Sequence, residues 1–246
     1  MQEKKYIASS FSVIFKAEIF LQGLLENIVN QDNFENIQFV FVNPNSPDNS
    51  ENILKPFLDK YNNFKYIKLE EDPGLYECWN IGVKNSDSEF VTNWNPDDRR
   101  TEDSITSLYN YISELTKIDL VYGVTMVTKN KNEKTEDCNS GLIYPFEEFS
   151  IKNLFFHNSP HCMPLWRKSM HEKYGYFDNS YKSAGDGEMW LRAAAKGSKF
   201  ALIKKIVGSY YESDETVSRD KNKIEFLVNE VYEMRSKILK QLMGLS

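Results

Sequence analysis

The sequence predicts an α/β fold, a single domain with a mostly parallel central sheet flanked by helices. In the first hundred residues, short runs of strand-forming residues alternate with segments whose apolar residues recur at helical spacing. Parallel strands need crossover connections of this kind, which helices usually provide. The length of 246 residues and the 41% hydrophobic content are enough for one sizeable core, and no interdomain linker is evident.

The first half of the chain carries the alternating pattern. The predicted strands cover residues 6–14, 37–42, 64–69 and 89–94, and the predicted helices cover residues 20–29, 48–61 and 75–83. Pro56 lies inside the second helix, which is therefore expected to kink there or to begin there. In such sheets ligands bind at the carboxyl ends of the strands, so the loops after these strands are expected to surround one crevice.

The second half is less regular. The predicted order is a helix over 105–115, a strand over 120–128, an exposed loop over 129–140, helical pieces around 167–174 and 186–196, a strand over 199–207 and a C-terminal helix over 223–242.

Composition argues against several classes of protein. The net charge of −6 argues against a nucleic-acid partner, because binding the phosphate backbone needs a basic face. Cys78, Cys138 and Cys162 are widely spaced, which indicates a reducing, cytoplasmic compartment rather than a disulfide framework. No apolar run approaches the ~18 residues of a membrane span. Lys4, Lys5 and the lysines of the tail leave open a peripheral contact with an anionic membrane surface.

A pair of carboxylates follows the fourth predicted strand. Asn95 and Pro96 lead directly into Asp97 and Asp98. Adjacent carboxylates repel and raise each other's pKa unless a cation or hydrogen-bond donors compensate. Mg²⁺ or Mn²⁺ provides such compensation, since these ions prefer oxygen ligands and share their shell with substrate phosphates. A plain surface turn is the competing interpretation, because Asn, Pro and Asp are all turn formers.

Two further segments combine glycine with acidic residues. Asp72 precedes Gly74, which permits a tight strand-to-helix turn whose helix N-terminus could face an anion; a capped helix is the competing interpretation. Asp186 lies between Gly185 and Gly187 at the start of an amphipathic segment. It is a candidate general base with room for an acceptor, and an N-cap is the alternative.

In order and spacing these segments resemble the family 2 glycosyltransferases, a likeness that covers residues 6–211. The segments that carry it are residues 17–31, 37–48, 72–82, 89–98 and 184–192. The resemblance implies a GT-A-type, Rossmann-like fold. It also implies a nucleotide-sugar-binding half (1–100), an acceptor-binding half (101–220) and a C-terminal helix (221–246).

The resemblance also implies roles for individual residues. Asp98 would coordinate Mn²⁺ or Mg²⁺, and Asp97 would contact the ribose or help to position the metal. Asn43 and Asp72 would lie near the base and ribose of the nucleotide. Asp186 would be the general base that deprotonates the acceptor hydroxyl.

Three residues are candidates for the acceptor side. Trp166 and Arg167 precede a helix, and an aromatic face with a guanidinium suits a sugar. His161 lies close to them and could approach the acceptor or the metal. Core packing is the competing interpretation for Trp166, and a structural role is the competing one for His161.

The implied activity is an inverting, metal-dependent transfer of a sugar, with a UDP-sugar favoured as donor. The acceptor would be a carbohydrate, a lipid-linked glycan or a protein-linked glycan, in the synthesis of a surface polysaccharide, glycolipid or glycoprotein. The sequence does not fix the oligomeric state.

Departures from the family pattern keep a second interpretation open. Asn43 and Asn95 stand where the family usually has Asp, and Gly185 stands where it has Glu. The usual Pro-x-Tyr-Asn run before the first helix is also missing. A catalytically inactive sugar- or nucleotide-binding relative is therefore one alternative. A nucleotidyltransferase is less favoured, because the chain has no Gly-rich phosphate loop after the first strand.

Overall fold

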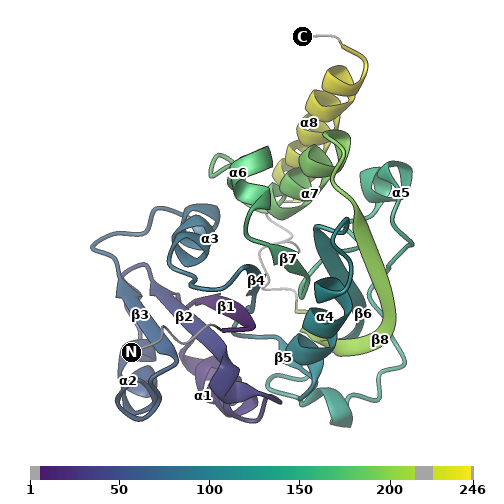
Figure 1. The fold of residues 1–246 in the computed structure, drawn as a ribbon. Coiled ribbons are helices and arrows are strands. Elements are labelled where there is room, and N and C mark those ends of the chain that lie inside the picture. The colour runs from purple at the N-terminus through teal and green to yellow at the C-terminus, as the bar shows by residue number, and fades with distance from the viewer. Residues whose placement is uncertain (1–5, 214–223, 245–246) are drawn as a thin grey trace.

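The computed structural model describes residues 6–213 and 224–244 (Figure 1). The strands are β1 (Ala8–Val13), β2 (Ile37–Asn43), β3 (Phe64–Lys68), β4 (Phe90–Asn93), β5 (Arg99–Arg100), β6 (Leu120–Thr128), β7 (Leu165–Arg167) and β8 (Phe200–Tyr211). The helices are α1 (Glu18–Val29), α2 (Ser50–Lys60), α3 (Leu75–Lys84), α4 (Ser104–Ser113), α5 (Ile151–Phe156), α6 (Met170–Tyr174), α7 (Gly185–Ala195) and α8 (Ile224–Leu242).

All eight strands form one sheet in the order β3-β2-β1-β4-β7-β6-β8-β5. β3, β2, β1 and β4 are parallel neighbours, as are β6 and β8. β7 is antiparallel to both of its neighbours, and the two-residue β5 is antiparallel to β8. The predicted α/β domain with a mostly parallel sheet is therefore confirmed, and the carboxyl ends of β1 to β4 lie along one edge.

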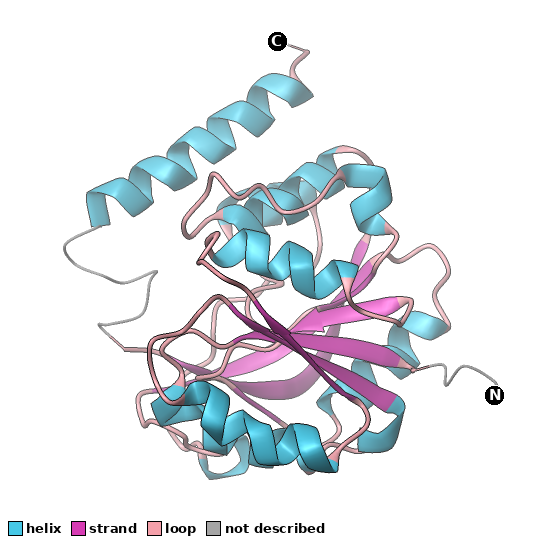
Figure 2. Cartoon of the chain, turned by 90° about the vertical axis from the view of Figure 1, so that its left-hand side faces the viewer, coloured by secondary structure: helices cyan, strands magenta, loops and turns pink. Residues whose placement is uncertain are grey.

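Helices cover both faces of the sheet, so the core has two layers (Figure 2). One layer lies under α1, α2 and α4, with Leu21, Leu25 and Leu108 fully buried. The other lies under α3, α6 and α7 and is rich in aromatic side chains, including Trp166 and Trp190. Burying each such side chain contributes ~1.5–3 kcal/mol relative to leaving it in water.

The structure departs from the sequence-based expectation in a few elements. α2 begins at Ser50 and continues through Pro56, whose missing N–H removes only the bond to the fourth carbonyl before it. β5, α5 and β7 were not predicted, and β8 continues beyond the predicted end at Val207 to Tyr211. Of the predicted C-terminal helix, residues 221–223, 245 and 246 lie outside the described residues, as do Lys4 and Lys5. No helix in the described ranges is long and apolar enough to cross a membrane.

Candidate active site

The carboxylate pair lies at the carboxyl end of β4, but its two members have different surroundings. Asp98 is 0% exposed, whereas Asp97 is half-buried. The N–H of Tyr211 donates to Asp98 Oδ1 at 3.1 Å, and the amide of Asn95 donates to Asp98 Oδ2 at 3.1 Å. Asp98 thus joins the loop after β4 to the end of β8. The side chain predicted as the metal ligand is an internal anchor, and Asp97 is the one that reaches the surface.

The charges of the pair are poorly compensated within the protein. Burial raises the pKa of Asp98 well above its ordinary value, and neighbouring Asp97 raises it further. Burial also raises the pKa of Asp97. A divalent cation fits such a pair, because it stabilises the ionised carboxylates. Among the residues that the structure describes, no group of three or more His, Cys, Asp or Glu side chains is arranged to hold a metal ion.

Two arginines support this loop from within. Arg100 is buried and donates to Thr92 Oγ1 at 2.6 Å, and burial lowers its pKa to about 9. Arg99 is also buried and donates to the carbonyls of Pro96 and Asp98 at 2.8 and 2.7 Å. Neither guanidinium is a solvated group at the start of a helix, because both arginines are buried. Their guanidiniums fix the backbone that presents Asp97.

Asp186 lies at the second position of α7 and is half-buried. The amide of Asn158 donates to its Oδ2 at 2.7 Å, and the hydroxyl of Tyr76 contacts its Oδ1 at 3.3 Å. Both partners come from other segments of the chain, and the N-cap position belongs to Ala184. The carboxylate is therefore oriented by tertiary contacts rather than by capping its own helix, as a general base requires.

Packing explains why Gly185 departs from the family pattern. A Cβ at Gly185 would lie 2.6–2.8 Å from ring atoms of Tyr76, closer than real side chains approach. The glycine lets the ring of Tyr76 lie flat against the start of α7. The two segments predicted around Gly74 and Asp186 therefore meet in space.

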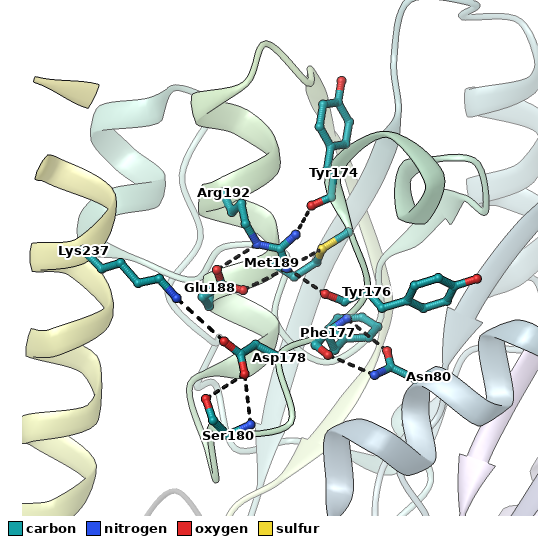
Figure 3. Close-up of polar contacts among 10 residues, drawn as sticks. All are labelled: Asn80, Tyr174, Tyr176, Phe177, Asp178, Ser180, Glu188, Met189, Arg192 and Lys237. Atoms are coloured by element: carbon teal, nitrogen blue, oxygen red, sulfur yellow. Dashed lines mark hydrogen bonds and ion pairs between the residues drawn. The ribbon is translucent and has the colours of Figure 1, made fainter. Parts of the chain in front are cut away.

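A network behind Asp186 fixes α7 in place (Figure 3). Arg192 donates to Glu188 at 2.8 Å within α7 and to the carbonyl of Tyr176 at 2.8 Å. Asn80 of α3 bonds both backbone groups of Phe177, at 2.9 and 3.0 Å. The segment between α6 and α7 is thus bound by side chains of both α3 and α7, and it fixes the position of α7 relative to α3.

Cys162 connects the two acidic groups, and sequence reasoning gave it no role. Its thiol is buried, and its backbone has a φ of 75°, a rare conformation for a non-glycine residue. Burial raises the pKa of this thiol, and the charges of Asp98, Asp186 and Asp97 raise it further. The segment around Cys162 contacts both groups, because Asn93 at the end of β4 donates to the carbonyl of Cys162 at 3.1 Å and Asn158 donates to Asp186 at 2.7 Å. A lone cysteine carries no sequence signal that could have predicted this.

The residues predicted near the nucleotide lie on the turns after β2 and β3. Asn43 is only 1% exposed; it donates to Tyr66 Oη at 2.9 Å and accepts from the N–H of Ser46 at 2.7 Å. It shapes the turn after β2, with both ends of its amide used internally. Asp72 is exposed and accepts from the N–H of Gly74 at 2.9 Å, at the start of α3.

Two of the three acceptor candidates are corrected by the structure. Trp166 is 0% exposed and donates to His171 at 2.9 Å, so it is a core residue. Arg167 pairs with Phe90, the first residue of β4, so it lies at the opposite end of that strand from the carboxylates. Its guanidinium donates to Glu89 at 2.6 Å and to the carbonyl of Ile118 at 3.0 Å.

His161 is the acceptor candidate that lies near the site. Its ring stacks on Tyr144 with centroids 4.2 Å apart and meets Tyr210 edge-on at 4.9 Å. Burial lowers its pKa, and the charge of Asp186 opposes this effect. His161 is thus part of an aromatic cluster with Tyr144 and Tyr210.

Comparison with known proteins decides the family. Residues 11–174, more than half of the chain, match the family described as Glycosyl transferase family 2. The chain belongs to this family. Residues 72–98, which hold three of the predicted site residues, lie within the matched region.

Curated relatives of this family 2 chain are longer proteins. It is 28% identical over 213 residues to the minor teichoic acid biosynthesis protein GgaB of Bacillus subtilis (strain 168). This alignment covers 83% of this chain and 23% of GgaB. It is 33% identical over 101 residues to the glycosyltransferase GlyA of Streptococcus pneumoniae serotype 4. This second alignment covers 41% of this chain and 14% of GlyA. The chain therefore matches less than a quarter of the length of either relative.

Solved structures confirm the GT-A fold of this family 2 chain. S. aureus TarS 1–349 in complex with UDP-GlcNAc superimposes with a TM-score of 0.70 at 17% identity, covering 96% of this chain and 71% of the TarS chain. The mannosyltransferase PcManGT from Pyrobaculum calidifontis, in complex with GDP-Man and Mn²⁺, gives a TM-score of 0.69 at 12% identity, covering 96% and 65%.

Proposed function

We propose that this chain is the catalytic domain of an inverting glycosyltransferase that moves a sugar from a UDP-sugar to a hydroxyl group of a cell-wall polymer. One observation carries the proposal. In a family 2 chain, residues 158–162 join the end of β4, which leads to the carboxylate pair, to a half-buried, oriented Asp186: Asn93 donates to the carbonyl of Cys162 at 3.1 Å, and Asn158 donates to Asp186 at 2.7 Å. The division into a donor half over 1–100 and an acceptor half over 101–220 is part of this proposal.

The residues of the site suit a single displacement. The oxygen of the acceptor hydroxyl attacks the anomeric carbon of the donor, and its proton passes to Asp186. The bond between that carbon and the diphosphate oxygen breaks, and the nucleoside diphosphate leaves with its electron pair. Asn158 and Tyr76 hold the carboxylate in place, so little reorganisation is needed during transfer.

Asp97 is the residue proposed to hold Mn²⁺ or Mg²⁺, with Asp98 anchoring the loop behind it. Such an ion would neutralise the charge that develops on the leaving diphosphate. The half-buried position of Asp97 and the raised pKa of both carboxylates support this assignment. The PcManGT complex, which contains Mn²⁺ beside GDP-Man, is consistent with it.

The donor and acceptor classes come from the relatives. TarS has been solved in complex with UDP-GlcNAc, and GgaB is a minor teichoic acid biosynthesis protein. A UDP-N-acetylhexosamine and a polymer of the teichoic acid type are therefore the proposed substrates. A cytoplasmic location with peripheral membrane contact remains a prediction from composition.

A panel of donors tests the proposal. UDP-, GDP-, dTDP- and ADP-sugars are each incubated with the protein, with and without Mn²⁺, while melting temperature and nucleoside diphosphate release are followed. Ligand at 100 times its Kd stabilises the native state by about 2.7 kcal/mol. Metal-dependent stabilisation and slow UDP release with a UDP-sugar are expected. Stabilisation without release by any donor would instead indicate an inactive binding relative.

A further inference from the structure

The C-terminal helix α8 contributes a buried carboxylate to the loop that carries Asp186. Glu230 lies on the inner face of α8 and is 8% exposed. It accepts hydrogen bonds from three consecutive backbone N–H groups, those of Lys182 at 2.5 Å, Ser183 at 2.8 Å and Ala184 at 2.8 Å. These residues directly precede α7, in which Asp186 is the second residue.

The contact fixes the segment that leads into α7. Ala184 is the N-cap residue of α7 and has no side chain that could accept a hydrogen bond. Glu230 does not replace such a cap, because it accepts from Lys182, Ser183 and Ala184 rather than from the N–H groups of the first helical turn. The carboxylate of Glu230 lies next to this N-terminus, where the helix dipole favours negative charge. Three N–H groups converging on one carboxylate fix the path of the backbone.

The loop is connected to the candidate base through Tyr76. The hydroxyl of Tyr76 donates to the carbonyl of Ser183 at 2.7 Å and lies 3.3 Å from Asp186 Oδ1. Ser183 is also one of the residues held by Glu230. A displacement of residues 182–184 would therefore move both the carbonyl that fixes Tyr76 and the carboxylate beside it.

A second contact from α8 holds the beginning of the same loop. Lys237 lies 3.7 Å from Asp178 Oδ2, and the N–H of Ser180 donates to Asp178 Oδ1 at 3.0 Å (Figure 3). This ion pair is partly exposed, so its own contribution is small. Both ends of the segment 178–184 are therefore bound to α8, one by Lys237 and the other by Glu230.

We propose that Glu230 is a positioning residue for the transfer step, acting through the backbone of residues 182–184 on Tyr76 and Asp186. The inference rests on the proposed function, because it takes Asp186 as the base. α8 is then part of the active site's support even though it contributes no group to the reaction. Donor binding, which is assigned to the other half of the domain, does not depend on it.

Glu230→Gln tests the inference, with Glu225→Gln on the exposed part of the same helix as the matched control. Each protein is assayed for UDP release from UDP-GlcNAc with Mn²⁺, for melting temperature, and for hydrogen–deuterium exchange of a peptide covering 180–187. The glutamine keeps the size of the side chain but brings an NH₂ group to the three donors. Glu230→Asp, which keeps the charge one methylene further away, is the second variant.

For Glu230→Gln we expect a kcat at least tenfold lower, a donor KM within twofold of wild type, and faster exchange at 182–184. Glu230→Asp should recover part of kcat, and Glu225→Gln should match wild type. A lower melting temperature with unchanged kcat would overturn the inference, because Glu230 would then only stabilise the fold. Unchanged exchange would overturn it as well. A wild type that releases no UDP would instead refute the proposed function, while exchange would still report whether Glu230 fixes the loop.

Discussion

At the scale of single residues, adjacent positions in the sequence have different roles. Asp97 and Asp98 read as an equivalent pair, yet one is half-buried and the other has no exposed surface. The sequence pattern predicts that two carboxylates follow a strand. Which of them is exposed depends on where β8 ends, because the N–H of Tyr211 donates to Asp98. That contact joins residues 113 positions apart, and no local pattern predicts it.

Substitution of the two carboxylates should therefore have opposite effects on stability and on metal binding. Asp98→Asn places an NH₂ group against a backbone or amide donor in a buried site, which should cost about 1–3 kcal/mol of unfolding free energy. Asp97→Asn should change that free energy by less than about 0.5 kcal/mol but remove the Mn²⁺-dependent stabilisation by UDP. Urea unfolding and thermal shift with UDP and Mn²⁺ measure both effects. Loss of the Mn²⁺ response only in Asp98→Asn would return the ligand role to that residue.

His171 gives a prediction for pH. It is 2% exposed, accepts the indole N–H of Trp166, and burial is the main cause that lowers its pKa from 6.5 to about 4. Between these values the unfolded chain binds a proton that the folded protein does not. The stabilisation is therefore complete above pH 6.5 and is lost as pH falls toward 4, by about 3 kcal/mol in total.

The matched variant is His171→Gln, whose carbonyl can still accept from Trp166 but cannot titrate. Unfolding free energies at pH 7 and pH 4.5 are compared for both proteins. The advantage of wild type over the variant should shrink by on the order of 2 kcal/mol at the lower pH. An advantage that does not change with pH would contradict the assignment.

At the scale of elements, α7 shows how local sequence and tertiary packing combine. The glycines on either side of Asp186 looked equivalent in the sequence, as a means of leaving space. In the structure a Cβ at Gly185 would meet the ring of Tyr76 at 2.6 Å, whereas a Cβ at Gly187 would meet only atoms at 3.6 Å or more. Gly185 is required by packing, and Gly187 is not.

Alanine substitution at the two positions separates these cases. Gly185→Ala should destabilise the protein by about 1–3 kcal/mol, because Tyr76 must move. Gly187→Ala should be neutral or stabilising by up to about 1 kcal/mol, because alanine is the better helix former. Thermal melts of both variants measure the difference. Equal destabilisation would show that the ring of Tyr76 does not pack against α7 as described.

Long helices and strands were predicted from the sequence more accurately than short ones. Helices and strands with a sustained period, such as α1, α3 and β6, were placed within a few residues. β5, β7 and α5 have only two, three and six residues, too few to show a period. The missed β7 explains the error at Trp166, which was expected near a helix on the acceptor side and instead lies in the middle of the sheet.

At the scale of the whole molecule, the parallel order of β3, β2, β1 and β4 places the carboxyl ends of these strands along one edge of the sheet, and the second half of the chain supplies Asp186 and the residues that hold it. The alternating pattern and the direction of parallel strands were enough to predict the first part. The second part depends on contacts between distant segments, such as Tyr76 with Asp186 and Glu230 with residues 182–184. Candidate residues could be predicted from sequence, but their support could not.

Asp186 is proposed to accept the proton of the acceptor hydroxyl, in a site whose donor binding does not depend on that carboxylate. The most direct test measures UDP release from UDP-GlcNAc, with Mn²⁺ and purified wall teichoic acid, by wild type and Asp186→Asn, together with the Kd of UDP for both. Turnover should fall by a factor on the order of 10²–10⁴ while the Kd stays within twofold. Wild-type turnover in the variant, or a parallel loss of UDP binding, would contradict the account.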